Sequence, residues 1–150
     1  MVEDYLWLKF LHLVLVFAGL GVGIATGLLL QFFGDHPTHG PFVLRAARKL
    51  QMVVVLPGYV LMLASGMWIA YVAHLLDAYW TETAMNIWGI GAVLMAASFV
   101  MLNRRLRLLE SQGPSSTAYR RASLWNRLLG GGAGAAILTI VYLMVLKPSH

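Results

Sequence analysis

A histidine and a series of glycines lie on one face of the first predicted helix. His12, Val16, Gly19, Gly23 and Gly27 follow one another at intervals of four, three, four and four residues. These intervals return to the same face of an α-helix. Small residues on such a face let a second helix, or a flat ligand, approach the backbone closely.

The sequence leaves two interpretations of this face open. In the first, the glycines form a helix-packing seam and His12 hydrogen-bonds to a neighbouring helix. In the second, the neutral imidazole of His12 ligates the iron of haem b, and Gly19 and Gly23 make room for the macrocycle. Because an ionisable side chain within a membrane span is costly, His12 is by default a candidate functional residue, but its position alone does not decide between the two interpretations.

Two further residues are candidates for the same site. His74 ends the second apolar segment, in the same half of the predicted bundle, and is a candidate second iron ligand; Met67, one or two turns deeper, is another. An interfacial position among lipid headgroups is the alternative interpretation of His74. Asn126 heads a second series with Gly130 and Gly134, so we count it as a candidate cofactor-binding residue, with close helix packing as the alternative.

The composition predicts an integral membrane protein of one domain, residues 1–150. Apolar residues make up 59% of the chain and charged residues 11%, against roughly 45–50% and about 25% in soluble domains. Cysteine is absent, which excludes disulfides and thiolate metal sites. Four segments are long and apolar enough to cross a bilayer: residues 5–33, 52–76, 84–102 and 128–146. We therefore expect an all-α, four-transmembrane-helix bundle.

The positive charges predict its orientation. Nine of the 11 lysines and arginines fall in the loops at residues 34–51 and 103–127, and the connection from Asp77 to Thr83 has none. The positive-inside rule makes these two loops cytoplasmic and puts both termini on the non-cytoplasmic side (N-out/C-out) of a bacterial-type inner membrane. This clustering explains the net charge of +5 without nucleic acid. The partners we expect are the lipid bilayer and, because four helices make a thin bundle, a homo-oligomer or larger membrane complex.

Prolines and glycines predict where the helices bend and end. Pro57 removes a backbone donor within the second segment and predicts a kink there. Pro41 is suited to open a short amphipathic helix over residues 42–50. The sequence Gly-Pro-Ser-Ser-Thr at residues 113–117 divides the last loop. Helical arms are therefore expected on both sides of this break.

Short motifs in order along nearly the whole chain resemble a known group of membrane proteins. They are Leu6-Trp7-Leu8-Lys9-Phe10-Leu11-His12, Arg48-Lys49-Leu50, Leu56-Pro57, Ser65-Gly66-Met67-Trp68, Trp125-Asn126 and Val145-Leu146-Lys147-Pro148. They look like the corresponding segments of HemJ-type protoporphyrinogen oxidases and related CopD-like integral membrane proteins. The resemblance implies a four-helix bundle in which His12 binds haem b, with porphyrinogen oxidation coupled to a membrane electron acceptor.

The chain departs from the HemJ-type enzymes at two positions. Those enzymes carry a functional lysine at the start of the third helix, where this sequence has Met-Asn-Ile-Trp at residues 85–88. The Pro-Arg pair expected near the end of the first helix is replaced by Leu30-Gln31. These departures place the chain in a separate branch of the group, in which haem binding is expected but the porphyrinogen reaction is not.

Two functions follow from the sequence, and they leave open whether the protein is an enzyme. The first is a haem-b-binding membrane redox protein that transfers electrons or oxidises a porphyrin-type substrate. The second is a non-catalytic accessory subunit of a larger, respiratory-type membrane complex, without its own cofactor and with the glycine faces as docking surfaces. A copper-related role is suggested only by the CopD-like resemblance, because the methionines form no paired motif.

Overall fold

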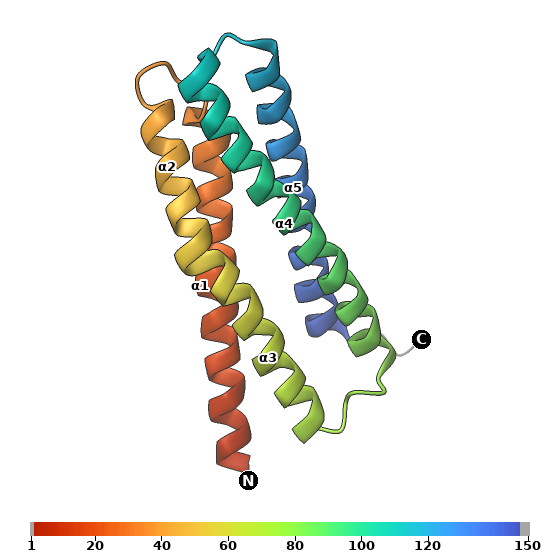
Figure 1. Cartoon of the computed structure of the whole chain (residues 1–150). Coiled ribbons are helices and arrows are strands. Elements are labelled where there is room, and N and C mark those ends of the chain that lie inside the picture. Colours follow the sequence, from red (N-terminus) through yellow and green to blue (C-terminus); the bar gives the residue numbers. More distant parts are fainter. Residues whose placement is uncertain (1, 148–150) are drawn as a thin grey trace.

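The computed structural model describes residues 2–147, which form long helices with no strand (Figure 1). The elements are α1 (Val2–Phe33), α2 (Gly40–Leu50), the π-helical turn η1 (Gln51–Val55), α3 (Leu56–Val72), α4 (Tyr79–Gln112) and α5 (Thr117–Leu146). Four continuous helices are long and apolar enough to cross a membrane: Tyr5–Phe33, Gly40–Val72, Tyr79–Gln112 and Thr117–Leu146. The predicted all-α, four-helix architecture is therefore confirmed.

The two chain ends lie at the same end of the bundle as the α3–α4 turn (Figure 1). We call this the terminal end. The α1–α2 and α4–α5 turns lie at the opposite end, which holds nine of the 11 basic residues and which we call the basic end. The helices pair in sequence order, with α1 against α2 and α3, and α4 against α5.

The second membrane helix bends where α2 gives way to α3, as the sequence predicts from Pro57 (Figure 1). Proline has no N–H and its ring clashes with the carbonyl four residues earlier. The chain widens into the π-helical turn just before it, where the Leu56 N–H donates to the Gln51 carbonyl, five residues back. Such turns are a known cause of helix kinks.

The helical arms expected around residues 113–117 are present. Helix α4 continues to Gln112 and stops at Gly113, whose φ is 78°. Helix α5 begins at Thr117, and the Ser116 side chain caps it by accepting a hydrogen bond from the Tyr119 N–H at 3.2 Å. Pro41 lies in the first turn of α2, where the missing N–H costs no hydrogen bond.

Large apolar side chains cover the outside of the bundle rather than its centre. Phe17, Val93 and Val145 are each 70% or more exposed. The buried core is divided into three small clusters, and the one at the basic end contains the fully buried Leu44 and Leu102. An exposed apolar surface of this extent is what a lipid-facing protein requires.

Candidate cofactor site

His12 of α1 faces α3 and is buried, with 7% of its surface exposed. Its Nδ1 lies 2.8 Å from the Ser65 Oγ. The Ser65 hydroxyl already donates its hydrogen to the Leu61 carbonyl at 2.7 Å, so it accepts from the His12 Nδ1–H. In the neutral imidazole this arrangement leaves the lone pair on Nε2, the tautomer that a metal ligand needs.

Gly66 lets the His12 ring lie against the backbone of α3. A Cβ added at Gly66 would lie 3.1 Å from the His12 Cε1, which is tighter than an ordinary contact. Ser65 and Gly66 belong to one of the motifs that carry the sequence resemblance, but nothing local in the sequence pairs them with His12. They are site residues that sequence reasoning missed.

His12 lines a cavity of about 470 Å³, which we call the histidine cavity. This volume falls within the ~300–1,000 Å³ range of small-molecule sites. The wall is largely apolar and comes from α1, α3, α4 and α5, with Met67 and Trp88 among its residues. Two exposed lysines, Lys9 and Lys147, line it toward the terminal end. The cavity thus combines an imidazole, an apolar wall and two positive charges.

His74 is not among the residues that line this cavity. Helix α3 ends at Val72, and His74 takes a left-handed conformation (φ 54°) in the exposed turn that follows. The Leu75 N–H donates to the Ala70 carbonyl at 2.8 Å, the hydrogen bond that typically accompanies such a helix end. The structure therefore brings Met67, rather than His74, into the cavity with His12. Within residues 2–147, no three His, Cys, Asp or Glu side chains cluster as a metal site.

The glycine face of α1 is partly packed and partly open, and Gly19 and Gly23 do not line the cavity that His12 lines. At Gly19 the helices are close: a Cβ there would lie 3.4 Å from the Met62 Sδ, and a Cβ at Gly58 would lie 3.7 Å from the Gly19 Cα. At Gly23 and Gly27 an added Cβ would meet nothing within 4 Å. The same face is a packing seam at Gly19 and open space closer to the basic end.

This open space is a second cavity of about 500 Å³, which we call the glycine cavity. Gly23 and Gly27 line it from α1, and Gly130, Gly131 and Gly134 line it from α5. It shares three lining residues with the histidine cavity: Tyr59, Met62 and Ile137. The Tyr59 hydroxyl donates to the Trp88 carbonyl at 2.9 Å and the two rings stack, so a fixed aromatic pair lies where the cavities meet.

Asn126 is 3% exposed and joins α5 to α4. Its Nδ2 donates to the Ser98 carbonyl at 2.9 Å and to the Ser98 Oγ at 3.2 Å. The Oδ1 has no hydrogen-bond partner, and the residue lines the glycine cavity. The contact between α4 and α5 therefore supplies hydrogen-bond partners for the amide nitrogen of Asn126 but none for its amide oxygen.

A charged cluster at the basic end was not predicted from the sequence. We call this cluster the Asp35 clamp, and its residues are Asp35, Arg105, Tyr119, Ser123 and Arg127. The Asp35 carboxylate accepts from the Arg105 Nη2 at 2.7 Å and is also paired with Arg127. Arg105 is fully buried, and its Nε donates to the Tyr119 Oη at 3.1 Å. Burial works to raise the pKa of Asp35, but the positive charge of Arg105, together with hydrogen bonds and Arg127, outweighs it and lowers the pKa.

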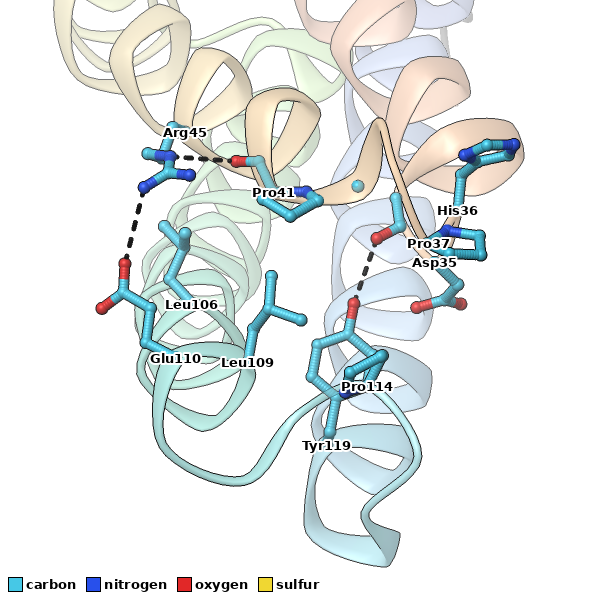
Figure 2. Close-up of a pocket in the computed structure, with 12 residues that line it drawn as sticks. Asp35, His36, Pro37, Pro41, Arg45, Leu106, Leu109, Glu110, Pro114 and Tyr119 are labelled. Atoms are coloured by element: carbon cyan, nitrogen blue, oxygen red, sulfur yellow. Dashed lines mark hydrogen bonds and ion pairs between the residues drawn. The ribbon is translucent and has the colours of Figure 1, made fainter.

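Two residues of the clamp, Asp35 and Tyr119, line a small cavity of about 240 Å³ at the basic end (Figure 2). The Tyr119 hydroxyl donates to the Gly34 carbonyl at 3.0 Å and so fixes the α1–α2 turn on α5. On the other side of this cavity Arg45 and Glu110 approach to 3.8 Å, but both side chains are more than 60% exposed, so this pair contributes little to stability. Asp35 thus ties the α1–α2 turn to α4 and α5.

The fold and the site define a multi-pass membrane protein with two adjacent cavities between its helices. The chain belongs to the family described as predicted integral membrane protein (DUF2269), whose model matches residues 6–148. No curated protein and no solved structure matches the chain.

Proposed function

We propose that this protein is a haem-b-binding membrane redox protein of the HemJ/CopD-like group, with His12 as an axial iron ligand. The observation that supports this most directly is the hydrogen bond from the His12 Nδ1–H to Ser65, which leaves Nε2 as the free ligating atom. A buried imidazole oriented in this way, beside a cavity of about 470 Å³, has the properties of a haem ligand.

The other lining residues also fit a haem. Its edge is apolar except for two propionates, and Lys9 and Lys147 offer positive charge at the terminal end of the cavity. Trp88 carries a buried Nε1 without a hydrogen-bond partner in the same wall. Four methionines line the cavity, and Met67 is the one that we propose as a second iron ligand. Bound haem would supply one-electron chemistry, while the protein supplies the ligand, the apolar environment and the charge balance.

An absorption spectrum of the detergent-purified protein tests the proposal. We expect a Soret band and sharp reduced α and β bands, lost in His12→Ala and kept in His36→Ala, whose parent residue is exposed and lies outside the histidine cavity. His74→Ala is expected to leave the spectrum unchanged and Met67→Leu to alter it. A colourless protein after expression with ample haem would refute the proposal.

The accessory-subunit function makes the opposite prediction. Gly23 and Gly27 leave room on α1 that a partner's helix could fill. In that case the colourless protein would co-purify with stable partners in native detergent. For localisation, we propose the bacterial-type inner membrane with the basic end cytoplasmic, on the strength of its nine lysines and arginines.

A further inference from the structure

The glycine cavity is polar at one end and apolar along the rest of its length. Arg127, Gln31 and Gln51 line it near the basic end, and Ile137 lines it toward the middle of the bundle. From Arg127 to Ile137 α5 rises about 15 Å at ~1.5 Å per residue. This length is half of the ~30 Å hydrocarbon core, or the depth of one leaflet.

The cavity opens on the lipid-facing surface between α1 and α5. Its exposed lining residues include Ile24 and Gly27 of α1 and Gly130 and Gly131 of α5. An added Cβ at Gly23, Gly27, Gly131 or Gly134 would meet nothing within 4 Å, so the glycines leave a channel that their own helices do not fill. A lipid chain can therefore enter from the side without displacing a protein side chain.

The polar end carries an excess of positive charge. Arg127 and the fully buried Arg105 share the single carboxylate of Asp35. Arg127 pairs with Asp35 through Nη2, but its Nε has no hydrogen-bond partner. The amide oxygen of Asn126, a residue that is 97% buried, has none either and could accept from a hydroxyl of a lipid headgroup. Two guanidinium groups that share one carboxylate leave one positive charge uncompensated, and the burial of Arg105 makes this charge more costly. An anionic group at this end would balance the charge, and a phosphate suits the donor geometry of arginine.

We propose that the glycine cavity binds an anionic phospholipid from the leaflet at the basic end. Its phosphate lies at Arg127, and one acyl chain follows the glycine-lined walls toward Ile137. Basic pockets between transmembrane helices bind anionic lipid headgroups for the same electrostatic reason. The apolar walls and the lateral opening select a lipid over a soluble anion. This site is distinct from the histidine cavity and does not depend on haem.

Native mass spectrometry of delipidated protein in detergent tests the site. The protein is mixed with equal amounts of phosphatidylglycerol and phosphatidylcholine that carry identical acyl chains. We expect a preferred phosphatidylglycerol adduct, whose affinity falls by about fivefold in Arg127→Gln, the value for one basic residue near a lipid surface. Arg121→Gln is the matched control, because Arg121 is exposed on the same helix and does not line the cavity.

A second pair of variants leaves the Asp35 clamp intact. Gly23→Leu fills the cavity and is expected to remove the adduct, whereas Gly21→Leu, on the same helix but outside the cavity, is expected to keep it. Equal binding of the two lipids would overturn the proposal. Equal losses of lipid affinity in Arg127→Gln and Arg121→Gln would also overturn it, because they would mean that the basic loops bind the lipid. Displacement of the lipid by inorganic phosphate would overturn it as well.

Discussion

The Asp35→Asn variant tests whether one carboxylate holds the basic end together. The substitution keeps a side chain of the same shape but removes the charge that compensates the fully buried Arg105. Removal of one partner from a fully buried pair costs about 3–5 kcal/mol. Because the Asp35 side chain is 45% exposed, solvent screening reduces this, and we expect a loss of about 2 kcal/mol in the free energy of unfolding.

Thermal unfolding in detergent, followed by tryptophan fluorescence, measures this loss. At ~2–4 °C per kcal/mol for a chain of this size, Tm should fall by about 4–8 °C. Asp77→Asn is the control, because Asp77 is exposed in the α3–α4 turn and should change stability by less than about 0.5 kcal/mol. If both variants lost the same stability, the reasoning about the clamp would be refuted.

The same carboxylate predicts a dependence on pH. Its pKa is lowered in the folded protein, so the unfolded chain takes up a proton first as the pH falls. The clamp therefore contributes its full stabilisation above the ordinary aspartate pKa of about 3.9 and loses it as the pH falls through the lower, folded value. The difference in Tm between wild type and Asp35→Asn should accordingly shrink in acid. A Tm difference that stayed constant as the pH fell would contradict the assignment of this stabilisation to the Asp35 carboxylate.

Three further predictions rest on the haem site that we propose in the histidine cavity. Gly66→Ala places a Cβ 3.1 Å from the His12 Cε1, so haem content after purification should fall, while Gly89→Ala, which meets nothing within 4 Å, should retain it. Ser65→Ala removes the acceptor for the His12 Nδ1–H, so the imidazole donates less electron density to the iron. A redox titration should therefore give a more positive haem potential. Protoporphyrinogen oxidation, followed by porphyrin fluorescence, should be weak or absent because residues 85–88 contain no lysine; robust turnover would show that the lysine is dispensable.

The sequence by itself determined the helices and the faces they present. Apolar length, the distribution of arginine and lysine, and the prolines at positions 41 and 57 are local signals, and each corresponds to a feature of the structure. The common face of His12 and Gly19 is equally local, because it depends only on the number of residues per helical turn. The orientation in the membrane remains a prediction from charge.

The tertiary structure decided which residues meet. Ser65 lies 53 residues from His12, and Arg105 lies 70 residues from Asp35. Nothing in the sequence separates Arg105 from its neighbours Arg104 and Arg107, although it alone of the three is fully buried. His74 lies outside the histidine cavity because α3 ends in a left-handed turn at that residue. Helix faces follow from the local repeat, whereas the register and rotation of one helix against another depend on all the packed side chains together.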